Sequence, residues 1–224
     1  MVQSECNRSK SICGSPDRQG IMISFPFSKT PSVYLKGERL FLREPQWSDY
    51  RQWANLREKS RAFLTPWEPV WRDDELEKSS FRLRLRHYSE EARSGNAWSL
   101  FLFRRSDNVL LGGITLGNIR RGVAQSGQIG YWCGAPHAGQ GYMFDALKLV
   151  IPFAFSELRL HRLEAACIPS NLRSVRLLEK AGFLLEGTLR SYLKINGLWQ
   201  DHLLYSLIEG EEQRRGLSVK TTAV

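Results

Sequence analysis

The sequence predicts a single domain of the α+β type, in which one mixed β-sheet carries helices on both of its faces. Three strand-like segments follow one another in the middle of the chain, and helices and strands alternate only after them, an order unlike the regular repeats of a doubly wound Rossmann fold. The 224 residues are 42% hydrophobic and 25% charged, which is enough for one complete core and fits the size of one domain.

The first predicted elements are a strand and two helices. Residues 39–43, Arg-Leu-Phe-Leu-Arg, are a short apolar run between two arginines and are predicted to form a strand. Ser48 or Asp49 can cap a helix that runs to about Arg57, and a second helix is expected over about 74–93.

A hairpin and a third strand are predicted next. Residues 98–104 and 109–116 read as two strands, and the Ser-Asp-Asn segment 106–108 supplies their turn. Residues 128–132 form the strand that leads into a glycine-rich segment.

The C-terminal half alternates helix and strand. A helical pattern of apolar residues covers 142–156, a strand covers 161–167, and a short helix over 171–181 ends at a glycine. Strands over 183–186 and 198–207 are expected to complete the sheet.

Both ends of the chain lack these patterns. Residues 1–36 are rich in Ser, Gly and Pro and are expected to form a flexible tail, as are residues 211–224. The N-terminus is a poor secretory signal. A separate hypothesis is that Met22 is the working start site. The longest apolar stretch, 147–155, is far shorter than the ~20 residues of a membrane span.

The cysteines and charges narrow the function classes. Cys6, Cys13, Cys133 and Cys167 form no metal-binding spacing, which predicts free thiols in a reducing cytoplasm and no metal. The net charge is +9, of which the first 36 residues supply +3 from five basic and two acidic residues. The other +6 comes with arginine pairs and triplets, which form either a solvated face or a surface attracted to ribosomal RNA.

The most informative segment is the glycine turn between the strand at 128–132 and the helix after it. Gly139 and Gly141 permit a tight turn, and the helix that begins near Gly141 directs unpaired N–H groups at its own N-terminus. Such a turn is either an ordinary connection or a site for the phosphates of a nucleotide-like cofactor.

Several motifs together resemble the GNAT acetyltransferases. They are the glycine turn, a strand about twenty residues later, Asn-Leu-Arg-Ser at 171–174 and Leu-Glu-Lys-Ala-Gly-Phe at 178–183. Further segments, at 61–69, 141–147, 161–162 and 196–202, resemble the RimJ branch, the ribosomal-protein alanine N-acetyltransferases. The resemblance covers about residues 37–210 and implies a mostly antiparallel sheet of about seven strands that splays in its middle.

The family resemblance implies acetyl-CoA as the acyl donor. The backbone of Gly139, Gln140, Gly141, Tyr142 and Met143 would hold its pyrophosphate. Trp132 and Cys133 would pair with the pantetheine arm, and Asn171 would contact the arm from the other side. Arg173 or Arg176 would meet the nucleotide phosphate or simply face solvent.

The catalytic groups differ from the broad family pattern. Leu178 stands where many members carry a tyrosine acid, and Ser174 is the substitute acid implied by the related RimL enzymes, unless it only caps its helix or contacts CoA. Leu193 stands where RimL enzymes have a glutamate base. The remaining base candidates are Glu68, Asp201 and His202, each of which has a purely structural alternative.

The acceptor is expected to bind at the segment 61–69, which the sequence suggests is a loop. Phe63 and Trp67 offer flat apolar walls, Glu68 offers one negative charge, and Tyr192 is a further candidate for the same groove. An α-amine, with a pKa of about 7.7–8.0, needs a weaker base than a lysine at about 10.4.

The resemblance therefore implies a cytoplasmic enzyme that acetylates the N-terminal alanine of a ribosomal protein, by direct attack within a ternary complex. Two alternatives stay open. One is an acetyltransferase of a small amine such as an antibiotic or a polyamine, and the other is a noncatalytic CoA-binding factor associated with the ribosome.

Overall fold

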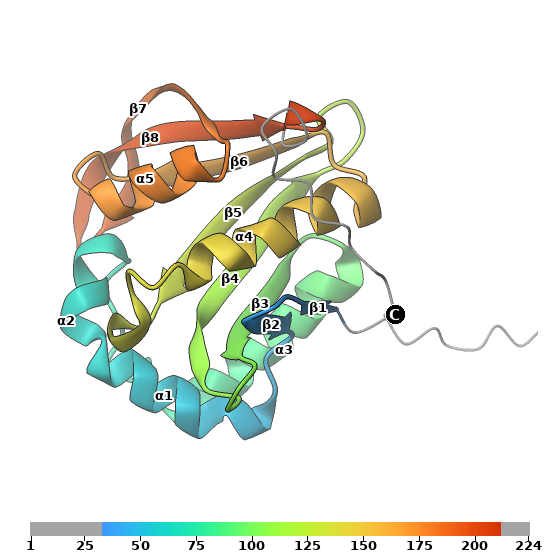
Figure 1. The fold of residues 1–224 in the computed structure, drawn as a ribbon. Helices are drawn as coiled ribbons and strands as arrows, with labels where there is room; N and C mark the ends of the chain where they lie inside the picture. The colour runs from blue at the N-terminus through green and yellow to red at the C-terminus, as the bar shows by residue number, and fades with distance from the viewer. Residues whose placement is uncertain (1–32, 212–224) are drawn as a thin grey trace, which may run out of the picture.

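The computed structural model describes residues 33–211 and contains one sheet of eight strands in the order β1-β2-β3-β4-β5-β6-β8-β7 (Figure 1). Every neighbouring pair is antiparallel except β5 and β6. The strands are β1 (Tyr34–Lys36), β2 (Leu40–Arg43), β3 (Trp98–Arg104), β4 (Leu110–Arg120), β5 (Ser126–Cys133), β6 (Arg162–Cys167), β7 (Leu184–Ile195) and β8 (Leu198–Ile208).

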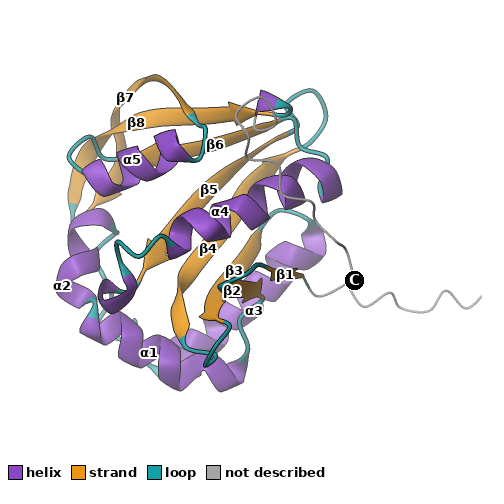
Figure 2. Ribbon diagram, in the orientation of Figure 1, coloured by secondary structure: helices purple, strands orange, loops and turns teal. Residues whose placement is uncertain are grey.

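Helices cover both faces of this sheet, which confirms the predicted fold class. The α-helices are α1 (Tyr50–Lys59), α2 (Arg61–Leu64), α3 (Lys78–Ser94), α4 (Tyr142–Pro152) and α5 (Leu172–Lys180). Three 3-10 turns, η1 (Trp47–Asp49), η2 (Thr65–Trp67) and η3 (Ala135–His137), and one π-helical turn, η4 (Phe153–Glu157), complete them. Figure 2 shows α4 and α5 on one face of the strands.

Alternation along β3 divides the core between the two faces. Leu100 and Leu102 pack in the cluster that contains the buried residues of α4. Phe101 and Phe103 point the other way and pack in the cluster that contains Phe81 of α3. The period-2 geometry of a strand thus lets one buried strand contribute to two cores.

The N-terminal boundary expected at residue 36 needs correction. Residues 34–36 form β1, and Leu35 pairs with Leu42 of β2 and packs against the main core. A strand of three residues is too short to show an alternating pattern in the sequence. The rest of the two expected tails, residues 1–32 and 212–224 with Met22, Cys6 and Cys13, lies outside the described residues.

Two other predicted segments differ from the structure, one in type and one in length. The segment 61–69 is mostly helical, since it contains α2 and η2, whereas the sequence suggested a loop. The strand expected at 183–186 continues to Ile195, and most of its residues are exposed because β7 forms the edge of the sheet. Exposed edge residues need not be apolar, so the sequence pattern faded before the strand ended.

The parallel pair β5 and β6 is short, and this positions the site. Residues 126–128 of β5 pair with residues 162–164 of β6, and no pairing is present between the rest of the two strands. β5 continues to Cys133 and β6 to Cys167, so the sheet is open between their C-terminal halves. The expected splay in the middle of the sheet is located here.

Phe81 tests the core on the α3 face. It is fully buried, and its ring centroid lies 4.7 Å from that of Trp53. We expect Phe81→Ala to lower the free energy of unfolding by about 3–5 kcal/mol, because the lost contacts leave a cavity. Denaturant unfolding followed by tryptophan fluorescence measures the change.

Leu83→Ala is the matched control, because Leu83 lies on the same helix and is 61% exposed. Its effect should stay within about 0.5 kcal/mol. Equal losses for the two variants would contradict the assignment of Phe81 to a tightly packed core.

Candidate active site

The glycine turn has the backbone geometry of an anion cradle. Gly139 and Gly141 have φ angles of +76° and +82°, in the left-handed region that favours glycine. Among the described residues, none accepts a hydrogen bond from the N–H groups of residues 139–141, and those of Tyr142 and Met143 belong to the first turn of α4. These donors and the positive end of α4 suit the phosphates of a nucleotide-like cofactor.

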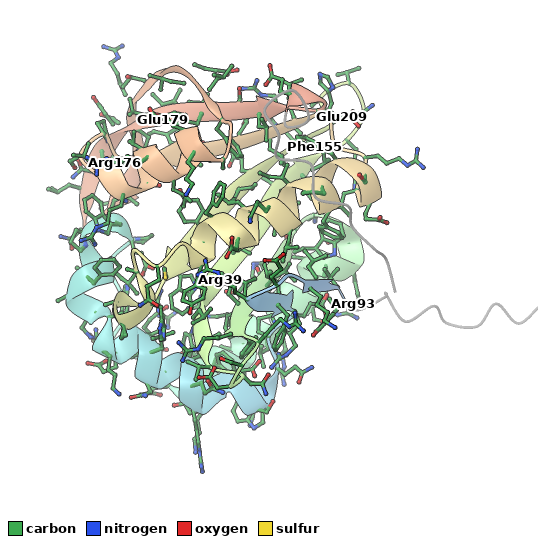
Figure 3. The ribbon with its side chains drawn as sticks, in the orientation of Figure 1. Arg39, Arg93, Phe155, Arg176, Glu179 and Glu209 are labelled. Atoms are coloured by element: carbon green, nitrogen blue, oxygen red, sulfur yellow. The ribbon has the colours of Figure 1, made fainter. Side chains whose placement is uncertain are left out.

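Arg39, which directly precedes β2 and is labelled in Figure 3, braces this turn. Its guanidinium donates to the Gln140 carbonyl at 3.2 Å and to the Asp145 carboxylate at 2.7 Å, and it lies 4.8 Å from the centre of the Tyr142 ring. The side chain of Gln140 donates to the Pro136 carbonyl and turns away from the site. Gln140 therefore supplies only backbone to the turn.

A cavity of about 480 Å³ lies between the turn, α5 and the end of β5, and we call it the donor cavity. Arg173, Arg176 and Lys180 of α5 give one of its walls a positive charge. The predicted site residues that line it are Phe63, Trp67, Glu68, Trp132, Cys133, Gly139, Gly141, Tyr142, Met143, Asn171 and Ser174.

A second cavity, of about 410 Å³, lies on the face of the sheet that α1 and α3 cover, and we call it the α3 cavity. Glu68, Tyr131 and Trp132 line both cavities. Successive residues of β5 point to opposite faces: Tyr131 packs with the α4 cluster and Trp132 with the α3 cluster. The two cavities therefore meet where β5 has separated from β6.

Tyr192 lies apart from Phe63 and Trp67, contrary to the expectation of one shared groove. It lines a third cavity, of about 500 Å³, with residues of α3, β5 and β6. This distal cavity shares Tyr88, Ser99, Thr115 and Gly130 with the α3 cavity. The two cavities on the α3 face are thus continuous, and Tyr192 lies at their far end.

Glu68 is held in place by a buried guanidinium. Its two oxygens accept hydrogen bonds from the two terminal nitrogens of Arg57, both at 2.7 Å, and one oxygen also accepts from the Trp71 indole at 2.7 Å. The Arg57 guanidinium lies 4.2 Å from the centre of the Trp71 ring and 5.0 Å from that of Trp132. A bidentate pair of this kind fixes both the position and the orientation of the carboxylate.

Ser174 lies at the base of the donor cavity in the first turn of α5. Its backbone N–H donates to the side chain of Asn171, the N-cap residue, at 3.2 Å. Its hydroxyl is 2.6 Å from the hydroxyl of Tyr131, and the residue is 8% exposed. Leu178, one turn further on, is completely buried in the main core and presents no polar group to the cavity.

The other base candidates lie elsewhere. Asp201 is exposed and accepts a hydrogen bond from the Ser191 N–H at 2.7 Å. His202 is buried, its Nδ1 lies 3.0 Å from the Gln200 carbonyl, and its ring packs edge-on against Tyr192. Neither residue lines the donor or the α3 cavity. Of the three candidates, the structure brings only Glu68 to the cavities.

The two described cysteines are poor nucleophiles at neutral pH. Burial raises the pKa of Cys133 to about 11, and burial also raises the pKa of Cys167. Both thiols are therefore protonated near pH 7, and they react slowly because the thiolate is the nucleophilic form.

Sequence reasoning missed Arg39, Arg57 and Tyr131. Arg39 contacts Gln140, 101 positions away, and Tyr131 contacts Ser174, 43 positions away. Arg57 and Glu68 are 11 positions apart. No local sequence motif marks pairs with these separations. The one available signal was the alternation of β5, which places Tyr131 and Trp132 on opposite faces.

The described residues contain no cluster of three or more side chains suited to hold a metal ion. Within the same residues, no helix has both the length and the apolar character needed to cross a membrane.

Comparison with known proteins gives consistent matches. The family model described as the acetyltransferase (GNAT) domain matches residues 39–184. The chain is 36% identical to the probable N-acetyltransferase YjcK of Bacillus subtilis, across 80% of this chain and 99% of that protein. It is 34% identical to the ribosomal protein uS5-alanine N-acetyltransferase of Escherichia coli, across 80% and 93% of the two chains.

A solved structure of Mycobacterium smegmatis RimJ in complex with CoA-disulfide also matches. It superposes with a TM-score of 0.74 at 28% identity, covering 83% of this chain and 94% of that one.

The raised pKa of Cys133 predicts how its rate of alkylation depends on pH. Iodoacetamide modification, quantified by peptide mass spectrometry, should rise about tenfold per pH unit from pH 7 to 10 without reaching a plateau, because the thiolate fraction is still growing there. A short unfolded peptide around Cys133 serves as the control and should level off above about pH 9. Matching profiles would show that the folded protein does not protect this thiol.

Proposed function

The chain belongs to the GNAT acetyltransferase family, and we propose that it transfers the acetyl group of acetyl-CoA to the N-terminal α-amine of a ribosomal protein that begins with alanine. The observation that carries the proposal is the meeting of the donor cavity and the α3 cavity at Glu68, Tyr131 and Trp132. This arrangement lets a donor and an acceptor approach one point from opposite faces of the sheet.

Acetyl-CoA is the acyl donor, and the donor cavity fits it. Gly139 and Gly141 supply the backbone for its pyrophosphate, and Arg173, Arg176 and Lys180 supply positive charge for the nucleotide phosphate. The C-terminal half of β5, at Trp132 and Cys133, has no strand partner on the β6 side, so it can pair with the pantetheine arm.

The acceptor peptide enters from the α3 cavity in this proposal. Phe63 and Trp67 line the donor cavity next to the junction, where they enclose the acetyl group and the first acceptor residue. The distal cavity with Tyr192 then receives the residues that follow. This order gives each of the four predicted acceptor residues a place along one path.

In this proposal Glu68 binds the acceptor amine and receives its proton. Arg57 and Trp71 hold its carboxylate at the junction and occupy three of its four lone-pair sites, which leaves one site on Oε1 for the amine. The carboxylate attracts the ammonium and takes up its proton, directly or through a water molecule. A minority of any α-amine is already neutral at pH 7, so this modest base suffices.

The chemistry proceeds by direct attack. The neutral amine adds to the thioester carbonyl, the carbon–sulfur bond then breaks, and the sulfur leaves with the electron pair as the Ser174 hydroxyl donates a hydrogen bond to it. The proton that the nitrogen loses as the amide forms passes to water. The high pKa of Cys133 argues against an acetyl-cysteine intermediate.

Ribosome association through arginines has limited support from the described residues. Several of these arginines already contact other groups of the same domain: Arg84 pairs with Glu75, Arg104 with Asp107 and Arg120 with Glu164, and Arg105 donates to the Gly37 carbonyl. We therefore favour the enzyme over a noncatalytic RNA-binding factor. As a modifier of ribosomal proteins it would work in the cytoplasm.

Turnover with defined acceptors tests the proposal. Thiol release from acetyl-CoA should occur with a peptide that begins Ala and should be lost when its N-terminus is blocked, even if the peptide contains lysine. Turnover with spermidine alone would support the small-amine alternative, and RNA binding without any turnover would support the noncatalytic factor. Comparing N-terminal acetylation across the proteome with and without the gene then identifies the acceptor.

Gly139 tests the cradle. We expect Gly139→Ala to weaken CoA binding about tenfold in calorimetry, because a φ of +76° costs an L-residue roughly 1–2 kcal/mol and the turn must relax. Gly95 is a matched control, since it has a φ of +74° and, like Gly139, nothing within 4 Å of an added Cβ. Gly95→Ala carries the same strain at the end of α3 and should leave CoA affinity unchanged; equal weakening would remove the turn from the binding site.

A further inference from the structure

We propose that Tyr131 is a positioning residue for the leaving thiolate, acting through Ser174. The two hydroxyl oxygens lie 2.6 Å apart, and both side chains line the donor cavity. The inference rests on the proposed function in one respect: it takes the sulfur of acetyl-CoA to lie beside Ser174.

The hydrogen bond has a preferred direction. A phenol is a stronger acid than an alcohol, and its oxygen is the weaker acceptor because its lone pair is shared with the ring. Tyr131 is therefore the donor and Ser174 the acceptor. Burial raises the pKa of the Tyr131 phenol, so the hydroxyl keeps its proton over the whole working pH range.

This direction decides where the Ser174 hydrogen points. A serine hydroxyl has one hydrogen and two lone pairs, and Tyr131 occupies a lone pair. The hydrogen is then free to point at the cavity. Among the described residues, Tyr131 is the one hydrogen-bond partner of the Ser174 hydroxyl, so no second acceptor competes for its hydrogen.

The chain of two hydroxyls strengthens the bond to sulfur. When the carbon–sulfur bond breaks, the electron pair stays on sulfur and Ser174 donates to that charge. Donation from Tyr131 to the Ser174 oxygen polarises the serine O–H, which makes it a better donor. No proton needs to leave Tyr131, so the step balances with both hydroxyls intact.

Tyr131 supplies the tyrosine hydroxyl that helix α5 lacks. Leu178 is buried and offers no hydroxyl to the cavity. Tyr131 reaches the same cavity from β5 instead, at the point where this strand has separated from β6. A tyrosine thus still serves the leaving group, but from the sheet and through an intermediate serine.

Tyr131→Phe and Ser174→Ala, alone and together, test the coupling. We expect Tyr131→Phe to lower kcat roughly tenfold and Ser174→Ala to lower it at least as much, with CoA affinity within about twofold of the parent. In the Ser174→Ala background, Tyr131→Phe should cause no further loss, because its route to the sulfur is already cut. Additive losses in the double variant would overturn the proposal and indicate a separate packing role.

Tyr205→Phe controls for loss of a buried tyrosine hydroxyl. Tyr205 is 1% exposed and donates to Glu179 of the same helix α5 at 3.3 Å, yet it lines none of the three cavities. Its kcat should match the parent. A loss equal to that of Tyr131→Phe would attribute both effects to α5 packing.

The assay separates this inference from the proposed function. Hydrolysis of acetyl-CoA without an acceptor expels the same sulfur, so it is measured alongside peptide acetylation. If the peptide is not acetylated but Tyr131→Phe slows hydrolysis, the proposed acceptor is wrong and the proposed role of Tyr131 stands. Peptide acetylation that Tyr131→Phe leaves unchanged would overturn the role of Tyr131 and keep the acceptor.

Discussion

The active region depends on one constraint of the sheet: β5 and β6 pair over only three residues on each strand and then separate. A parallel pair requires a long crossover, here the glycine turn, α4 and η4, so the turn is brought to the C-terminal end of β5. The unpaired part of β5 exposes backbone groups that a bound arm can satisfy. It also lets Tyr131 and Trp132 face two cavities that a continuous sheet would keep apart.

Local requirements made half of this site predictable from the sequence. Positive φ angles at Gly139 and Gly141 and the Asn171 cap of α5 are properties of short segments, so their residue types mark them. The division of β3 and β5 between two faces follows equally from alternation. The fold class, the turn and the short helix were therefore expected, whereas β1 and the exposed half of β7 carry too little apolar pattern to be recognised.

The remaining half depends on which distant residues meet. Tyr192, Asp201 and His202 stand on β7 and β8, and the sequence gives no measure of how far these strands lie from the segment 61–69. The structure places Tyr192 in the distal cavity and turns the other two away from the donor and α3 cavities. Pairings such as Arg57 with Glu68 depend on tertiary packing, and many other carboxylates were equally available to this arginine in the sequence.

The Arg57–Glu68 pair is better explained by position than by stability. Burying two charges costs several kcal/mol per ion, and a well-packed apolar pair of similar volume often serves stability as well or better. The structure nevertheless surrounds Arg57 with two indole rings and adds a third donor, Trp71, to Glu68. The Glu68 carbonyl also accepts a hydrogen bond from the Asn196 N–H at 2.9 Å, which ties η2 to the turn between β7 and β8. These contacts hold a single carboxylate where the two cavities meet, and a charge fixed in that place has its clearest use in receiving an amine.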